Sequence, residues 1–141
     1  MKNKTIIQAI LSSLLVCLFC LPTSSQAKAQ KVDEELSLAL KNVSGNVYCL
    51  EGPGGNVGIL KTDEGLLVVD SLIHQVEDAF LKQLTALSTT PLKIKYLINT
   101  HYHGDHTDGD EAIGKIAETI IMHSNCKTSL IKRLKEKVAE N

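Results

Sequence analysis

Short apolar runs joined by glycine-rich segments make up residues 46–70. The runs are NVYCLE, NVGILKT and LLVVD, and the joints between them are GPGG and the turn DEG at 63–65. Runs of this length with glycine at the joints are typical of β-hairpins, so we predict three consecutive strands. Across residues 74–88 the apolar side chains instead recur every three or four positions. That spacing predicts an amphipathic helix with one face on a core.

The second half of the chain alternates these two patterns. KIKYLIN and TIIM are predicted strands, DEAIGKIA is a short helix between them, and residues 130–138 carry the spacing of a last helix that begins near Ser124 or Asn125. Asp108 or Asp110 is expected to cap the short helix, because aspartate accepts hydrogen bonds from free N–H groups at a helix start. Strands alternating with helices predict an α/β fold with helices on at least one face of a sheet.

The runs LLVV and TIIM are apolar at consecutive positions, without alternation. Continuous apolar strands are typical of sheets that are covered on both faces. The predicted helices supply a cover for one face. Because the rest of the sequence supplies none, we expect the second face to remain uncovered within this chain.

The N-terminal residues have the layout of a secretory signal peptide. Two lysines precede an apolar core at residues 9–21, and the small-residue pattern AKA follows it. We therefore predict a signal peptide at 1–29, cleaved after Ala29 or, as the near alternative, Ala27, and an exported domain at 30–141 that is periplasmic or secreted. A stable membrane anchor is disfavoured, since the core falls short of the roughly 20 apolar residues that span a bilayer.

The charge and the cysteine content bear on nucleic-acid binding and on disulfide formation. Cleavage would remove three of the 15 basic residues, leaving 12 against 16 acidic ones and a net charge near −4. With Arg133 as the one arginine and few aromatic residues, nothing supports binding to nucleic acid. Cys49 and Cys126 would remain, in a compartment where disulfides persist. The sequence leaves open whether they pair or are two separate buried thiols.

Three of the five histidines lie in the stretch HYHGDHTDGD at residues 101–110. His101 and His103 follow a predicted strand at positions i and i+2, so their imidazoles can project to one side and share an ion. Asp105 and His106 come directly afterwards and suit a second cation close by. We therefore predict a site for one or two Zn²⁺ ions with His101, His103, Asp105 and His106 as the ligands.

This ligand set also predicts a reaction type. Two ions about 3.5 to 4 Å apart would hold a water and lower its pKa toward about 7, so the expected nucleophile is metal-bound hydroxide. Asp105 is the candidate catalytic residue, because its carboxylate can orient that hydroxide or carry a proton to the leaving group. His74 and His123 are isolated in the sequence and are not expected to be ligands.

The segment HYHGDH after a hydrophobic strand resembles the His-x-His-x-Asp-His signature of the metallo-β-lactamase superfamily. The upstream GGNVGILKTDEGLLVVDS resembles the opening strands of that family. LINTHYHGDHTDGDEAIGKIAETIIMHSN is similar to its metal loop with the helix and strand that follow. The resemblance therefore extends over residues 46–125.

The resemblance implies both a fold and a set of residue roles. The family fold is an αβ/βα sandwich of two similar halves with a dinuclear zinc site at one edge, and this chain corresponds to its N-terminal half. His101 and His103 match ligands of the first zinc, Asp105 and His106 match ligands of the second, and Asp70 matches a residue that supports the metal loop. The remaining family ligands lie beyond the positions of this sequence.

We therefore predict an exported zinc-dependent hydrolase that attacks an ester, thioester, lactone or β-lactam carbonyl of a small-molecule substrate. With half of the family ligands absent, the chain alone is expected to hydrolyse these substrates poorly or not at all. A non-catalytic periplasmic metal-binding protein is one alternative, and an interaction half-domain that self-associates or is completed by a partner is another. The family usually has glycine at the position of Asp108, so the resemblance does not predict the backbone conformation there. The GPGGN joint is expected to be a hairpin turn, with a pocket rim as the alternative.

Overall fold

The computed structural model of the protein describes Lys28, residues 36–88 and residues 91–140. The chain divides into two units, Met1–Glu35 and Leu36–Asn141, and Lys28 is the one described residue of the first. The predicted signal peptide and its cleavage site therefore lie almost wholly outside the described residues. Within the described ranges, no helix has the length and apolar character needed to cross a membrane.

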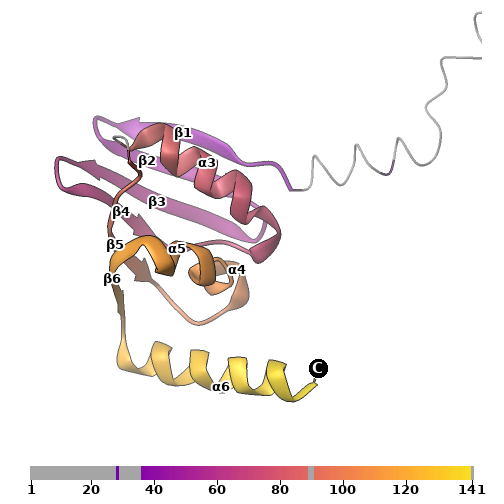
Figure 1. Cartoon of the computed structure of the whole chain (residues 1–141). Helices are drawn as coiled ribbons and strands as arrows, with labels where there is room; N and C mark the ends of the chain where they lie inside the picture. Colours follow the sequence, from indigo (N-terminus) through magenta and orange to yellow (C-terminus); the bar gives the residue numbers. More distant parts are fainter. Residues whose placement is uncertain (1–27, 29–35, 89–90, 141) are drawn as a thin grey trace, which may run out of the picture. The chain divides into compact units, whose positions relative to one another are not determined.

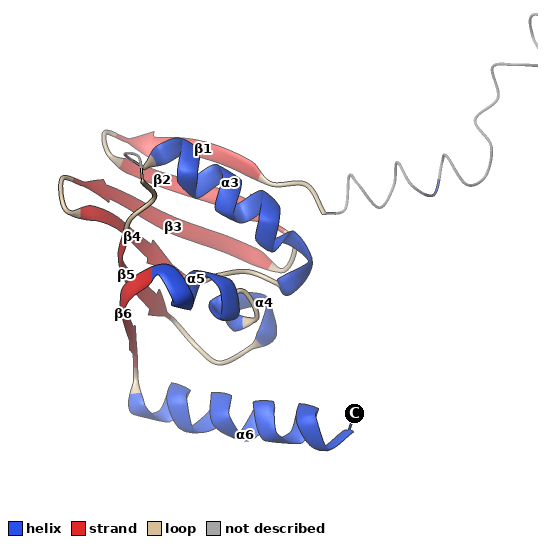
Figure 2. Cartoon of the chain, viewed as in Figure 1, coloured by secondary structure: helices blue, strands red, loops and turns tan. Residues whose placement is uncertain are grey.

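The described residues of the second unit form six strands and five helical segments, and its first four strands are consecutive (Figures 1 and 2). In chain order they are β1 (Ala39–Ser44), β2 (Val47–Gly52), β3 (Gly55–Thr62), β4 (Gly65–Val69), η1 (His74–Val76), α3 (Glu77–Leu87), β5 (Ile94–Asn99), α4 (Gly104–Thr107), α5 (Asp110–Ile116), β6 (Ala117–Met122) and α6 (Ser124–Glu140). Every strand and helix predicted from the sequence is present. The sequence did not predict β1, because five of its six residues are exposed and it contains no apolar run.

All six strands join one sheet in their order along the chain. The strands from β1 to β4 pair antiparallel, whereas β4 pairs parallel with β5, and β5 with β6. A parallel pair requires a crossover connection. The two crossovers contain α3 and α5, which Figure 1 shows over the same face of the sheet. The carboxyl ends of β4 and β5 consequently lie at one edge of the sheet.

The face beneath these helices carries the hydrophobic core. Ile59, Val68 and Leu97 lie opposite one another across three neighbouring strands and are at most 2% exposed. Phe80 of α3 and Ile113 of α5 pack into the same cluster and are fully buried. Because each such side chain contributes roughly 1.5 to 3 kcal/mol when it is fully buried, this cluster holds the helices onto the sheet.

The opposite face of the sheet, here called the open face, is apolar without being buried. It consists of two cross-strand rows, Val47, Leu60, Leu67 and Tyr96 in one and Cys49, Gly58, Val69, Ile98 and Ile121 in the other. All of these residues are half-buried or exposed. Within the described part of the chain, β4 thus has a cover on one face only, as the sequence predicted, whereas in β6 both Ile120 and Ile121 are 44% exposed.

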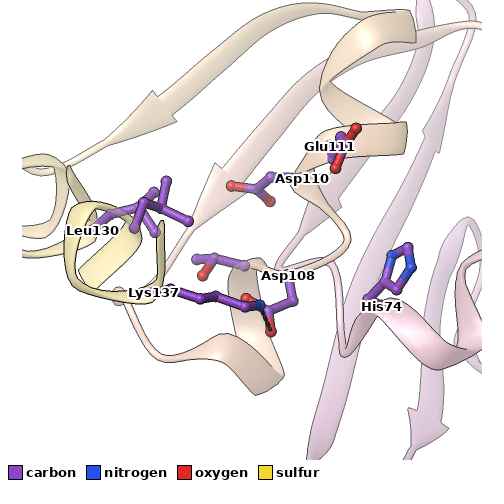
Figure 3. A pocket seen from close by; sticks show the side chains of 8 residues that line it. His74, Asp108, Asp110, Glu111, Leu130 and Lys137 are labelled. Carbon is purple, nitrogen blue, oxygen red and sulfur yellow. Dashed lines mark ion pairs between the residues drawn. The ribbon is translucent and has the colours of Figure 1, made fainter. Parts of the chain in front are cut away.

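The last helix, α6, makes little apolar contact with the rest of the unit. Cys126 in its first turn is buried, whereas Ile131, Leu134 and Val138 are 44 to 78% exposed. A cavity of about 580 Å³ lies between α6 and the start of α5 (Figure 3). The attachment of α6 to its neighbours therefore depends strongly on polar contacts.

Candidate metal centre

Residues 100–107, here called the metal loop, follow β5 at the edge of the sheet where β4 also ends. Because β4 and β5 are parallel neighbours, the residues after β4 meet the metal loop directly. The amide of Asp70 donates to the carbonyl of Ile98 at 2.8 Å, and the amide of Ser71 donates to that of His106 at 2.9 Å. These main-chain bonds fix the segment after β4 against the metal loop.

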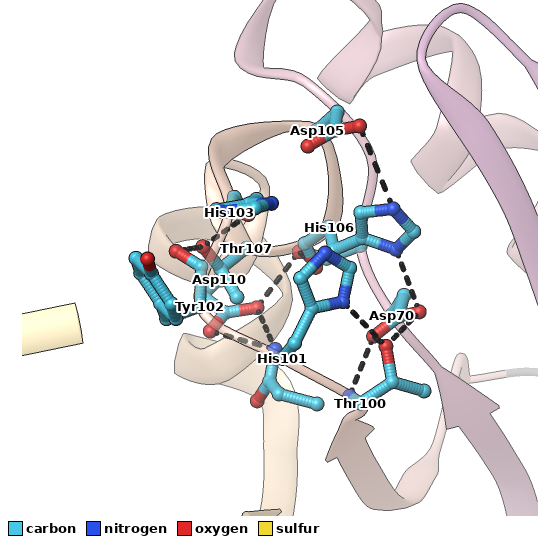
Figure 4. Close-up of polar contacts among 11 residues, drawn as sticks. Asp70, Thr100, His101, Tyr102, His103, Asp105, His106, Thr107 and Asp110 are labelled. Atoms are coloured by element: carbon cyan, nitrogen blue, oxygen red, sulfur yellow. Dashed lines mark hydrogen bonds and ion pairs between the residues drawn. The ribbon is translucent and has the colours of Figure 1, made fainter. Parts of the chain in front are cut away.

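The carboxylate of Asp70 supports the metal loop. It accepts hydrogen bonds from the amide and the hydroxyl of Thr100 and from Nδ1 of His106, each at 2.8 Å (Figure 4). Asp70 is 4% exposed, so water competes little for these bonds. Its φ of 67° lies in a region that aspartate adopts more readily than most residues. The contacts confirm the supporting position that the family resemblance implied.

Three of the four side chains predicted as ligands, His101, His103 and Asp105, form a group that could hold one ion, and His106 lies beside it (Figure 4). One ligand atom each from His101, His103 and Asp105 lies within 4.8 Å of the other two. The ring of His101 lies 4.8 Å from that of His103 and 4.1 Å from that of His106, measured between centroids. Oδ2 of Asp105 lies 3.5 Å from Nε2 of His106. Asp105 is therefore within reach of both the His101–His103 pair and His106.

The donor set of this cluster fits zinc. Two imidazoles and a carboxylate are ordinary zinc ligands, and three protein ligands with a fourth position open are typical of catalytic sites. Bonds of about 2.0 to 2.2 Å place tetrahedral ligand atoms roughly 3.3 Å apart, so the cluster would contract around an ion. The hydrogen bond from Nδ1 of His106 to Asp70 fixes the tautomer whose Nε2 can bind a metal.

The hairpin tip between β2 and β3 lies against the metal loop. A Cβ atom added to Gly54 would meet Cβ of Asp105 at 2.6 Å, and one added to Gly55 would meet Cε1 of His106 at 3.2 Å. Glycine therefore permits a close approach that a side chain would prevent. The GPGGN joint is the predicted hairpin turn, and it also forms a wall beside Asp105.

A second carboxylate, that of Asp110, belongs to a polar network behind the metal loop. Oγ of Ser71 donates to it at 2.7 Å, and Nδ2 of Asn99 reaches both of its oxygens at 3.0 Å. Burial raises the pKa of the Asp110 carboxyl, while the hydrogen bonds from Asn99 and Ser71 oppose that rise. Because Ser71 also bonds the main chain of His106, Asp110 is linked to the metal loop through Ser71.

The prediction that Asp108 or Asp110 caps α5 is wrong. The N-cap residue is Gly109, and no side chain caps the helix. A side-chain cap normally has an extended backbone, whereas α4 ends directly before α5 and leaves Asp108 and Gly109 helical. A Cβ at position 109 would stand 2.2 Å from the carbonyl oxygen of Ser71. Asp108 has a φ of −72°, so it occupies the family's usual glycine position without strain.

Among the described residues, the histidines and cysteines outside the metal loop have other environments. Nδ1 of the exposed His74 lies 3.0 Å from Oε2 of Glu77, and Nδ1 of His123 accepts a backbone N–H two residues further on. Cys49 and Cys126 are unpaired, and burial raises the pKa of the Cys126 thiol. None of these four side chains belongs to the metal cluster of the described residues.

Sequence reasoning missed four residues that make polar contacts within or beside the metal loop, namely Ser71, Asn99, Thr100 and Arg133. The first three lie directly after β4 or at the end of β5. Polar residues at the carboxyl ends of neighbouring parallel strands are a general signal for a site, and that signal was available here. Arg133 carried no comparable signal, because it lies within a helix of mixed polar and apolar residues.

The model of the metallo-beta-lactamase superfamily matches residues 50–120, which is half of the chain. The chain belongs to this superfamily. Its sheet, with α3 and α5 on one face, is the N-terminal half of the αβ/βα metallo-β-lactamase sandwich. No curated protein matched the sequence.

Several solved metallo-β-lactamase structures share the fold. A B3 enzyme described as the first with an active-site glutamic acid is 26% identical, with a TM-score of 0.57 over 70% of this chain and 38% of that one. The enzyme from Hirschia baltica is 19% identical, with a TM-score of 0.53 over 68% and 48%. FIM-1 from Pseudomonas aeruginosa, in its mono-zinc form, is 14% identical, with a TM-score of 0.57 over 70% and 47%. This superfamily member thus spans 38 to 48% of the length of these three proteins.

Proposed function

We propose that the chain is an exported zinc-dependent hydrolase that acts on an ester, thioester, lactone or β-lactam carbonyl of a small molecule. The observation that supports this most directly is the convergence of His101, His103 and Asp105 within the segment that matches the superfamily. An acidic and imidazole donor set of this kind is suited to a divalent cation, as argued above, and hydrolysis is the chemistry that such sites support best.

Bound zinc lowers the pKa of a coordinated water to about 7 and so supplies a nucleophile at neutral pH. The side chains of this chain have separate tasks around it. His101 and His103 would hold the ion, and His106 is oriented by Asp70. The side chain of Asp105 is 40% exposed, so one carboxylate oxygen can bind the ion while the other exchanges a proton with substrate or water.

The metal loop supplies four ligands, which suffice for one ion with three of them or for two ions with two each. Either arrangement leaves coordination positions to water. We therefore propose that the chain by itself binds zinc weakly and turns over substrate slowly. Small errors in position are costly in such sites, since a shift of about 1 Å can reduce a rate by about 100-fold.

Zinc content and zinc affinity of the purified chain test the metal assignment. Changing both His101 and His103 to alanine should abolish the bound zinc. The matched control changes His74 and His123 to alanine, which removes the same number of histidines from outside the cluster and should leave binding intact. Unchanged binding in the first variant, or equal loss in both, would overturn the assignment.

Zinc-dependent hydrolysis of a β-lactam, a thioester and a lactone tests the proposed catalysis. Slow turnover that depends on zinc and disappears in Asp105→Ala supports it. Firm zinc binding with no turnover of any of the three substrates would instead favour the non-catalytic metal-binding protein. Efficient turnover by a verified monomer would contradict the expectation that the chain alone is impaired.

Export is proposed from the N-terminal sequence pattern alone. The mature protein should begin at Gln30 or Lys28 and should be recovered outside the cytoplasm. N-terminal sequencing of the protein from separated cell fractions measures both points. Recovery of Met1 from a cytoplasmic pool would contradict export.

The open face favours a second candidate, an interaction half-domain. Its apolar rows extend across β2 to β6, and Val47 and Ile121 are each 44% exposed. Apolar patches of more than a few hundred Å² on a monomer commonly mark interaction sites. We propose that a second copy of the chain covers this face when the purified chain is concentrated.

A further inference from the structure

We infer that Arg133 of α6 is a positioning residue for the metal loop and that it couples the docking of α6 to metal affinity. The inference rests on the zinc site of the proposed function. Nη1 of Arg133 lies 2.8 Å from Oδ1 of Asp108, and Nη2 donates to Oγ1 of Thr107 at 2.9 Å. One planar guanidinium therefore holds Thr107, the last residue of the metal loop, and Asp108 directly after it.

The contact continues from Thr107 to a predicted ligand. Oγ1 of Thr107 accepts from Arg133 and donates to the carbonyl of His103 at 2.9 Å. That carbonyl also accepts the amide of His106 at 3.1 Å. Thr107 is 4% exposed, so solvent does not replace these partners. Two consecutive hydrogen bonds thus connect α6 to the backbone that carries the His103 imidazole.

The guanidinium occupies a space that glycine leaves open. A Cβ atom on Gly104 would stand 2.8 Å from Nη1 of Arg133 and 2.8 Å from Oδ2 of Asp108. The side chains of Arg133 and Asp108 are 24% and 23% exposed, so the pair is partly shielded from solvent. Asp108 is also the residue that departs from the family's usual glycine. The pair is therefore a feature of this chain and not of the family signature.

Lys137 provides a weaker contact with the same carboxylate. Its Nζ lies 3.9 Å from Oδ2 of Asp108, and its side chain is 61% exposed (Figure 3). An exposed pair at this distance contributes little compared with a partly buried guanidinium that makes two short contacts. Arg133 is accordingly the main polar connection between α6 and the metal loop among the described residues.

Apolar contacts do not provide an alternative connection at this point. The cavity between α6 and α5 separates the two helices beside Asp108, and Leu134 on its wall is 45% exposed. Because α6 is held near the metal loop mainly by the Arg133 contacts, its docking and the loop conformation are linked. Linkage is reciprocal, so a bound metal must favour the docked helix by the same factor by which docking favours the metal.

Two single variants and their combination test the inference in the full chain. Arg133→Gln and Asp108→Asn should each raise the zinc Kd about 10-fold, as is usual for residues that position ligands. The double variant should bind no more weakly than Arg133→Gln, because that change already removes the partner of Asp108. Zinc competition against a chromophoric chelator measures the Kd. The absorption spectrum of the Co²⁺-loaded protein reports the ligand geometry and should change in each variant.

Lys132→Gln is the matched control, because it removes a cation from the same helix. The Nζ of Lys132 lies 3.9 Å from Oε1 of Glu136, and the two side chains are 79% and 62% exposed. This variant should retain the parent Kd and Co²⁺ spectrum. Zinc should also slow amide hydrogen exchange in α6 of the parent, and this protection should be lost in Arg133→Gln.

The outcomes separate the inference from the proposed function. A parent chain that binds no zinc would refute the function, and the inference with it. A parent that binds zinc, with unchanged Kd and Co²⁺ spectrum in Arg133→Gln and Asp108→Asn, would refute the inference alone, even if both variants melted earlier. If Arg133→Gln does not fold, Arg133→Lys is the variant that decides. One ammonium cannot reproduce both guanidinium contacts, so a zinc Kd equal to that of the parent would refute the inference.

Discussion

Gly54 and Asp105 lie so close together that a Cβ atom at position 54 would stand 2.6 Å from Cβ of Asp105. The glycine has a φ of +84°, a conformation that side chains with a Cβ rarely adopt. This glycine therefore provides the positive φ of the β2–β3 turn and also lets the hairpin pack against the candidate catalytic carboxylate. The hairpin limits where Asp105 can lie.

Gly54→Ala should weaken zinc binding about 10-fold or more, because the new methyl group must displace Asp105 or the hairpin. It should also cost about 1 to 2 kcal/mol in unfolding free energy from the left-handed backbone. Gly45→Ala is the control, since Gly45 has a φ of +52° but nothing lies within 4 Å of its added Cβ. Zinc titration and thermal unfolding should show a stability loss in both variants but an affinity loss only in Gly54→Ala.

Asp70→Asn should reduce zinc affinity about 10- to 100-fold, because the amide cannot accept the hydrogen bonds of Thr100 and His106 together. Leaving one of these buried donors unsatisfied should also cost about 1 to 3 kcal/mol. Asparagine tolerates the positive φ at this position, so backbone strain does not confuse the result. Asp63→Asn, in the exposed β3–β4 turn, should change neither quantity in the same zinc titration and urea unfolding.

The order of strands and helices could be predicted because their apolar periodicity reflects burial. The helix α3 and the strands β2 to β5 carry buried apolar positions, and β6 carries an apolar run although its isoleucines are exposed, whereas β1 is paired through its backbone and is mostly exposed. Backbone pairing leaves no hydrophobic pattern in the sequence. That is why β1 could not be predicted.

The candidate site could be predicted only in part for a similar reason. His101, His103 and Asp105 lie within a few residues of one another, so the ligand cluster could be predicted from a short stretch of sequence. Arg133 acts on the metal loop across a distance in sequence that no local pattern encodes. Asp108 and Asp110 were assigned to a helix cap from their type, but the preceding turn α4 gives them ion-pair and hydrogen-bond partners instead.

The pH dependence of stability should contain a term from Asp110. Burial raises the pKa of this carboxyl in the folded protein above its ordinary value of 3.8. As the pH rises from 3.8 toward the raised pKa, the unfolded chain releases its proton first, so folding becomes less favourable, and the loss is complete above the raised pKa. Relative to Asp110→Asn, the parent should therefore lose unfolding free energy through that window and stay constant above it.

Urea unfolding of parent and Asp110→Asn between about pH 4 and about pH 7, with a chelator present to exclude metal effects, measures this difference. The substitution is well suited to the site. Oδ1 of Asn99 is buried and has no hydrogen-bond partner among the described residues, so rotation of the Asn99 amide would let this oxygen accept from the new amide. A parent that gained stability over the variant as the pH rose would contradict the predicted sign.

The open face should make the purified chain self-associate as its concentration rises. Stable interfaces bury about 800 Å² on each partner, and the two apolar rows across β2 to β6 provide a continuous surface for such contact. Replacing Leu60 and Ile121, which are 37% and 44% exposed, with glutamate should shift the chain toward monomer, because a docked copy would bury unpaired charges. Sedimentation velocity in chelator, which excludes association through shared zinc, measures the shift.

Val43→Glu is the control, since Val43 is 62% exposed but lies at the register shift of β1, outside both rows. A parent that remained monomeric at every concentration, or association that survived both glutamates, would contradict the assignment of this face.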